Sequence, residues 1–508
     1  MNEKLSIFKP SIIIPGVFFA ILSAAICMQI MGQFGNAPNT SLISLVLLMS
    51  IAKISVTVAS IFSDPEKQNY IISIASASGF VAANCAFISI AMLFVMERDD
   101  LLFPIALGTL VGSLITVFSM GKLFDTKIFP AEGSWPTGKA IATMIEAGNQ
   151  GGKKSRELFQ GVFVGVLSSV FGIPAAGIGI AFIANVVTMI AMAIGVILRG
   201  FSIYIFNGFD IGSSNIPQGL MIGAGSVAFF QILFSFKNKN KINNHFDINQ
   251  NSAIIFIKPL LLFVLGAVIT AFASGLLFYM TPFMLFIWVL FCSLAALIAM
   301  LLIGVASMNT GIAPAFAVVT IFLTVGLFVG FGAEPLSVFI GYLSSVGMPF
   351  ADTGISLKAG YIIRGNGKNK EHELYGRKQQ IILKYIGVFI GVIMAFVFSG
   401  VLIENNVIPP MSHFYANAVT SVLSYYVLRE IVLWAIPGVI LQIAFGNKSV
   451  GLMLATGLFI NNSIFGVVVL FAVLIRLVIG TKHMSVRAPG LIAGDGIFGF
   501  LNNLLRLF

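Results

Sequence analysis

The stretch that decides the fold runs from residue 129 to residue 167 as FPAEGSWPTGKAIATMIEAGNQGGKKSRELFQGVFVGVL. Two breaker clusters interrupt its polar part, Trp135-Pro136-Thr137-Gly138 and Gly148-Asn149-Gln150-Gly151-Gly152, and a short helix is predicted between them over residues 139–147. The basic segment 153–156 follows and leads directly into a long apolar run. A basic segment at the end of an apolar span is typical of the cytoplasmic edge of a membrane helix.

Gly152-Lys153-Lys154-Ser155 superficially matches the end of a phosphate-binding loop. That loop requires Gly, four residues and then Gly-Lys-Ser/Thr, placed after a strand. Here Ala147 stands at the first Gly position, Lys154 stands at the hydroxyl position, and no strand is predicted before it. The sequence therefore does not predict a nucleotide site.

The composition is that of a membrane protein. Of the 508 residues, 58% are hydrophobic and 9% are charged, and the mean hydropathy is +1.00, whereas soluble domains carry about 25% charged residues. Apolar runs of about 20 residues recur along nearly the whole chain. We predict an all-α, polytopic, multi-pass integral protein of the cell (inner) membrane, with about 14–16 transmembrane or re-entrant helices in the lipid bilayer.

The net charge of +10 does not indicate a nucleic-acid partner. Most Lys and Arg residues stand in short segments between apolar runs, as the positive-inside rule expects. Cys27, Cys85 and Cys292 each stand alone inside an apolar run, which predicts small buried hydrophobic residues rather than a metal site or disulfide. We expect no resident cofactor or metal.

The apolar runs place the helices and the topology. Basic residues predict that segments 148–156, 236–258, 362–378 and 476–487 face the cytoplasm. Only three runs separate the first two of these segments, and an odd number cannot return the chain to the same side, so we predict an extra split or re-entrant element in each half. The expected helices cover residues 11–31, 41–62, 70–96, 101–121, 158–178, 180–206, 217–235, 259–280, 282–304, 311–331, 335–357, 379–403, 413–443, 450–475 and 489–506.

Three pairs of similar segments, in the same order, predict an internal repeat. They are 35–38 with 311–314, 76–79 with 344–347, and 161–166 with 387–392. The expected domains are a first repeat over residues 1–236, a polar linker over 237–258 and a second repeat over 259–508. Spans broken at matching places are typical of secondary transporters, and they predict a midplane cavity lined by Gly35, Pro38, Gly79, Gly311, Pro314 and Gly347.

Three motifs resemble the oligopeptide transporter family, which includes the yellow-stripe metal-chelate transporters. They are Trp135-Pro-Thr-Gly-Lys-Ala-Ile-Ala142 with the Ala-Gly and Gly-Gly-Lys steps after it, Leu357-Lys-Ala-Gly-Tyr361 with Arg377-Lys-Gln-Gln380, and Gly490-Leu-Ile-Ala-Gly-Asp-Gly496. The resemblance implies proton-driven uptake of oligopeptides or peptide-like metal chelates. The chain departs from the family pattern at Thr143 and Glu146.

Ionisable side chains inside membrane spans are costly, so each is a functional candidate. Asp352 and Glu430 are the leading candidates for proton coupling, because no histidine is expected within a span, and Asp352 has no basic neighbour in sequence before Lys358. The structural alternatives are a loop carboxylate at Asp352, an ion pair of Glu430 with Arg429, and a snorkelling lysine at position 53. Further candidates for binding the substrate or the proton are Glu132, Glu146, Trp135, Lys358, Tyr361, Asn149, Gln150 and Lys53.

A passive channel and an intramembrane enzyme are the alternatives to a carrier. A passive channel also uses broken helices and stays the alternative to a carrier. An intramembrane enzyme is not predicted, because the chain contains neither His-Glu-x-x-His nor Gly-x-Ser-x-Gly. The expected partners are a small peptide or metal-chelate substrate and the bilayer, and the sequence leaves a homo-oligomer open.

Overall fold

The computed structural model describes residues 9–35, 64–149, 153–238, 252–310, 313, 315–420, 425–446, 450–460, 462–481, 484 and 486–505. Over these residues the secondary structure is helical, apart from one isolated bridge between Phe124 and Phe129. The first half contains α1 (Pro10–Phe34), α4 (Pro65–Phe80), the π-helix η1 (Val81–Phe87), α5 (Ile88–Val95), η2 (Asp99–Leu101), α6 (Leu102–Leu123), α7 (Pro136–Asn149), α8 (Lys153–Val170), α9 (Ala175–Ile183), α10 (Val186–Ile205), η3 (Ile211–Ser213) and α11 (Ile216–Asn238).

The second half contains α12 (Ser252–Ala273), η4 (Leu276–Phe278), α13 (Pro282–Thr310), α14 (Ala315–Val329), α15 (Ala333–Ile363), α16 (Lys370–Glu404), α17 (Pro410–Thr420), α18 (Tyr425–Phe445), α19 (Val450–Phe459), α20 (Ser463–Ile479) and α21 (Arg487–Leu505). Seven helices of the described chain are long and apolar enough to cross a membrane. The all-α membrane fold expected from the sequence is therefore confirmed.

Several expected spans are split into two helices. The span expected over 450–475 is α19 followed by α20, and 158–178 covers α8 and the start of α9. α9 has nine residues and α19 has ten, so each is about 15 Å long and cannot cross a hydrocarbon core of about 30 Å. The prediction of split elements in both halves is confirmed.

Local sequence explains these breaks. Between α8 and α9 the backbone turns at Gly172, which has a φ of +72°, and α9 begins directly after Pro174. α10 starts at an Asn185 cap whose side chain accepts the Val187 N–H at 2.9 Å, and α20 starts at an Asn462 cap that accepts the Phe465 N–H at 3.1 Å. Capping satisfies backbone donors that a continuous apolar helix would have paired internally.

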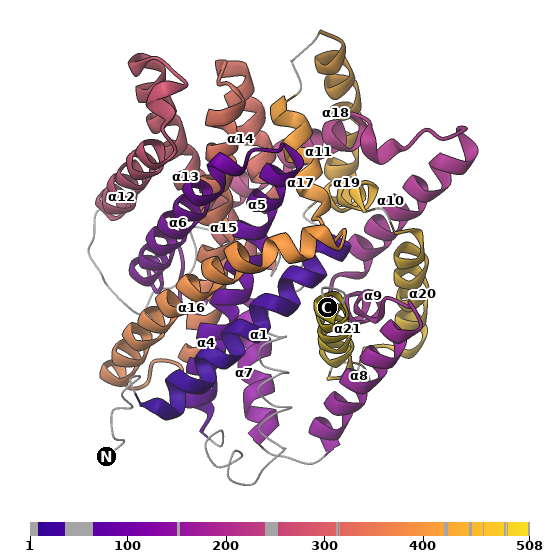
Figure 1. Ribbon diagram of the computed structural model, residues 1–508. Coiled ribbons are helices and arrows are strands. Elements are labelled where there is room, and N and C mark those ends of the chain that lie inside the picture. The colour runs from indigo at the N-terminus through magenta and orange to yellow at the C-terminus, as the bar shows by residue number, and fades with distance from the viewer. Residues whose placement is uncertain are drawn as a thin grey trace.

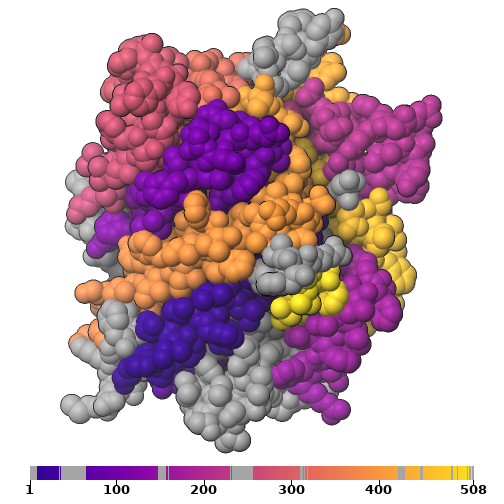
Figure 2. Space-filling model, viewed as in Figure 1, coloured from indigo at the N-terminus to yellow at the C-terminus, as the bar shows by residue number. Residues whose placement is uncertain are grey.

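Helix pairs from the two halves cross at small residues. In Figure 1, α4, α6, α15 and α16 lie on the left of the view, while α8, α9, α20 and α21 lie on the right. Figure 2 shows α16 lying between α6 and α1 on one face. Gly387 and Gly391 of α16 pack against the carbonyl oxygens of Ile74 and Ser78 in α4. Such close backbone approach is the role of small residues in membrane helix packing.

Two further helix pairs make matching contacts. In the α8–α21 pair, a Cβ on Gly165 would meet the Leu491 carbonyl, and one on Gly494 would meet the Val162 carbonyl. In the α11–α18 pair, Gly438 stands in the same way against Leu220, and Gly223 against Ala435. If the two halves are repeats, these contacts make α8 the counterpart of α18 and α21 the counterpart of α11. The similar segments 161–166 and 387–392 instead make α8 the counterpart of α16. The internal repeat itself stays a prediction.

Two segments expected as loops contain helix. α12 begins at Ser252, so the end of the expected linker 237–258 is helical. α15 runs to Ile363 and α16 begins at Lys370, which corrects the basic loop expected over 362–378. Arg364 and Arg377 are buried there, and the Arg364 Nε lies 2.7 Å from Glu373 Oε2. Both arginines are paired with carboxylates within the protein. Their presence therefore does not indicate whether this segment faces the cytoplasm.

Candidate functional site

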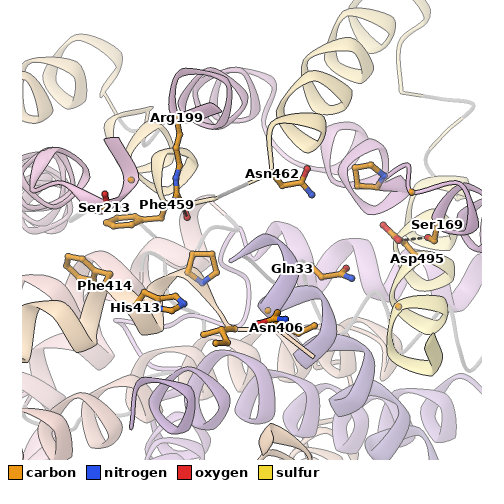
Figure 3. Close-up of a pocket in the computed structure, with 18 of the residues that line it drawn as sticks. Gln33, Ser169, Arg199, Ser213, Asn406, His413, Phe414, Phe459, Asn462 and Asp495 are labelled. Carbon is orange, nitrogen blue, oxygen red and sulfur yellow. Dashed lines mark hydrogen bonds between the residues drawn. The ribbon is translucent and has the colours of Figure 1, made fainter. Parts of the chain in front are cut away.

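A cavity of about 810 Å³ opens where several helix breaks meet (Figure 3). The break 171–174 between α8 and α9, the turn 405–409 before α17 and the end of α19 all contribute to its wall, together with the last turn of α1 and the middle of α21. Both halves of the chain therefore form it. The wall is formed by Gly32, Gln33, Ser169, Gly172, Ile173, Pro174, Arg199, Gly212, Ser213, Ser214, Gln218, Asn406, Val407, Ile408, Pro410, His413, Phe414, Asn417, Phe459, Asn462, Asp495, Phe498, Gly499 and Asn502.

The cavity wall is amphipathic. Amides and hydroxyls such as Gln33, Asn406 and Ser213 can exchange hydrogen bonds with a polar solute. The rings of Phe414 and Phe459 lie together, with centroids 5.1 Å apart, and supply an apolar surface. A polar, Asn-rich wall with a local aromatic surface suits a solute that combines peptide-like groups with apolar side chains.

Among the described residues that line the cavity, Asp495 alone is acidic. Its side chain is 5% exposed, the hydroxyl of Ser169 donates to Oδ1, and the backbone N–H of Ala176 donates to Oδ2 at 2.7 Å. Ala176 belongs to the first turn of α9, where unpaired backbone N–H groups favour an anion. Figure 3 shows Asp495 and Ser169 joined at one end of the cavity.

Arg199 is bound from two sides. Its Nε donates to Asp210 Oδ1 at 2.9 Å and its Nη2 donates to Oδ2 at 2.7 Å, while Nη1 donates to the carbonyl oxygen of Phe459 at the end of α19. Asp210 lies in the turn after α10. Burial alone would raise the pKa of Asp210, but the hydrogen bonds and charge of Arg199 and the N–H of Gly212 outweigh it and hold that pKa below its usual range.

Arg476 plays the corresponding part in the other half. From α20 its Nη1 donates to the carbonyl of Ala181 at 2.7 Å and to that of Ala184, at the end of α9. Arg199 and Arg476 stand at the same spacing after the capping residues Asn185 and Asn462. Each arginine thus satisfies the last carbonyls of the short helix in the opposite half, and Arg199 in this way fixes the end of α19 at the cavity wall.

The family model described as OPT oligopeptide transporter protein matches residues 10–260. The chain belongs to the oligopeptide transporter family. The resemblance found in the sequence motifs is confirmed, and this is a family of membrane transporters rather than of enzymes. No curated protein matches the chain.

In this member of the oligopeptide transporter family, Asp352 is paired with a basic residue, although its position in the sequence suggested that it had no basic neighbour. It is 1% exposed within α15, and the ammonium group of Lys384 in α16 lies against its Oδ2. Lys384 also donates to the Ser76 hydroxyl of α4 at 2.7 Å. The helix packing brings together residues that the sequence separates, and Asp352 lies outside the cavity wall.

Four other candidates gather where the segment 130–135 meets the end of α15. Lys358 donates to the Ala131 carbonyl at 2.6 Å, and its ammonium group lies 5.3 Å from the Tyr361 ring centroid. Trp135 is fully buried, and its Nε1 donates to the Pro130 carbonyl at 3.1 Å. Glu132 is exposed. This cluster also lies outside the cavity wall.

The remaining candidates are scattered. Glu430 is exposed and accepts a hydrogen bond from the Asn215 amide at 2.7 Å, and Glu146 is exposed on α7. Asn149 ends α7. Lys53, Gln150, Pro38, Gly311 and Pro314 lie outside the described residues.

The predicted glycine breaks lie beside or away from the cavity. Gly35 ends α1 with a φ of +66° and packs against Pro410, a residue of the cavity wall. Gly79 and Gly347 are buried within α4 and α15. Arg199, His413 and Asn462 belong to the wall but were not predicted as site residues. Asp495 was predicted only as part of the family motif 490–496.

Proposed function

We propose that this protein is a secondary active transporter that takes up oligopeptides or peptide-like metal chelates across the cell membrane, coupled to proton entry. The observation that carries the proposal is the polar cavity formed by helix breaks of both halves, because broken helices place free backbone groups at the binding site of secondary transporters. Membership of the oligopeptide transporter family supports the substrate class.

Two repeats, residues 1–236 and 259–508 joined by the linker 237–258, are the proposed moving parts. The reciprocal glycine contacts of α8–α21 and α11–α18, and the reciprocal caps made by Arg199 and Arg476, support this division. Rocking of one repeat against the other would expose the cavity alternately to each side.

Asp352 with Lys384 is the leading proposed coupling element. In the buried pair each charge compensates the other. Protonation of Asp352 would leave the Lys384 ammonium group as an uncompensated charge in the packed interior, which is strongly unfavourable. The α15–α16 contact would then rearrange, and proton binding would be linked to helix movement. Glu430, Glu132 and Glu146 remain secondary candidates, because they are exposed and no buried ion pair holds them within the described part of the chain.

The function is tested by reconstituting the purified protein in proteoliposomes. We expect tripeptides or metal–peptide chelates to accumulate when the outside is more acidic, and expect unlabelled substrate inside to accelerate entry of labelled substrate. Accumulation without a gradient is not expected. Entry that obeys the solute gradient alone, with no acceleration by internal substrate, would instead identify a passive channel.

A further inference from the structure

Asp495 is a carboxylate in a setting that does not favour one. It lies within the apolar stretch Gly490–Gly499 of α21, it is 5% exposed, and it lines the cavity. Its partners are one hydroxyl, from Ser169, and one backbone N–H, from Ala176. Neutral donors leave its negative charge uncompensated, and burying such a charge is costly.

No cation offsets this charge among the residues that the structure describes. Arg199 and His413 are the other ionisable residues of the wall. The guanidinium of Arg199 is already engaged by both oxygens of Asp210 and by the Phe459 carbonyl. Arg487 of the same helix lies near Glu157. In its ionised form, the carboxylate of Asp495 gives the cavity a negative charge that the described residues of the wall do not balance.

The helix packing does not require a carboxylate at this place. Residues 219–225 and 490–496 share the pattern Gly-Leu-x-x-Gly-x-Gly, and Gly223 and Gly494 make the same kind of backbone contact with the neighbouring helix. The residue after Gly223 is Ala224, which is fully buried. The residue after Gly494 is Asp495. An alanine serves in one contact and an aspartate in the other, so packing alone does not account for Asp495.

We propose that Asp495 is the residue of the cavity that binds a positively charged group, namely the free ammonium group of a peptide substrate. This assignment rests on the proposed transport function. The Ser169 and Ala176 bonds fix the carboxylate, and each oxygen retains a lone pair for an ammonium donor. The amides of the wall then contact the peptide groups that follow. An inorganic cation such as Na⁺ shares this chemistry and is separated from the peptide by the test.

The test measures binding of matched tripeptides to the purified full-length protein in nanodiscs, each with a free or an acetylated amino terminus, and of NaCl at constant ionic strength. We expect the free tripeptide to bind about 10- to 100-fold more tightly than its acetylated form. Asp495→Asn should remove this preference, and Asp495→Glu should restore part of it. Asp100→Asn, an exposed carboxylate outside the cavity, should leave the preference unchanged.

The possible outcomes separate the inference from the proposed function. The role of Asp495 is overturned if free and acetylated peptides bind equally, or if Asp495→Asn keeps the preference for the free peptide. In either case, transport of both peptides would still support the proposed function. Binding of Na⁺ that depends on Asp495, without a peptide preference, overturns the peptide assignment in favour of an inorganic cation. If no peptide binds and none is transported, both proposals fail. Asp495→Ala introduces the residue that stands at the corresponding position, Ala224, of the α11–α18 contact. Its melting temperature should stay close to that of the wild type, which would show that a loss of peptide preference does not come from misfolding.

Discussion

The Asp352–Lys384 pair makes a sharp prediction at the scale of single residues. Asp352→Asn leaves the buried Lys384 charge alone, which should cost about 3–5 kcal/mol of stability. The double variant Asp352→Asn/Lys384→Met removes both charges and should recover most of that loss, yet it should not accumulate substrate against its gradient. Thermal unfolding and proteoliposome uptake measure the two effects. Proton-driven accumulation at the wild-type level by the double variant would remove the pair from the coupling mechanism.

The Arg199–Asp210 pair predicts a dependence of stability on pH. Because the folded-state pKa of Asp210 is lowered, the pair stabilises the protein at pH values above the ordinary Asp pKa of about 4, and the contribution disappears as the pH falls through the lower folded-state value. Asp210→Asn should therefore lower the melting temperature at pH 7, by an amount equivalent to about 1 kcal/mol or less for this partly exposed pair. A loss of equal size at pH 7 and pH 3 would show that the ion pair is not its cause.

At the scale of helices, the glycine contacts can be tested in matched positions. A Cβ at Gly223 would collide with the backbone carbonyl of Ala435, so Gly223→Ala should destabilise the α11–α18 pair by about 1–3 kcal/mol. At Gly400 in α16 a Cβ would meet no atom within 4 Å. Gly400→Ala should be neutral or stabilising, by up to about 1 kcal/mol. The test compares the melting temperatures of the two variants. Similar values for both would contradict the predicted close contact between Gly223 and the backbone of α18.

The helices also show what sequence patterns can and cannot predict. Apolar runs located most spans, because hydropathy depends only on neighbouring residues. The run 450–475 was predicted as one span, although the polar triplet Asn461-Asn462-Ser463 interrupts its apolar composition and Asn462 caps α20 there. Lys384 lies within the span predicted over 379–403, and its sequence position does not indicate a partner. Only the packing of α15 against α16 brings its ammonium group to the carboxylate of Asp352.

The cavity belongs to the scale of the whole molecule, and this explains why its wall could not be predicted. Ser169 and Asp495 are joined across the two halves of the chain, as are Arg199 and Phe459. The motif 490–496 identified the family, but it did not indicate that Asp495 faces a cavity. The cavity is formed by helix breaks of both halves, but none of the predicted lining residues that the structure describes, Gly35, Gly79 and Gly347, belongs to its wall.

The central claim is that substrate passes through this cavity, and alkylation of a single introduced cysteine tests it most directly. The native cysteines at 27, 85 and 292 are all buried, whereas Asn406 is exposed in the wall. We predict that Asn406→Cys reacts with a maleimide, that substrate slows this reaction, and that complete labelling abolishes uptake. Phe278→Cys, at a position 91% exposed and away from the cavity, should be labelled without loss of uptake. Undiminished uptake by fully labelled Asn406→Cys protein would contradict the assignment of the cavity as the transport site.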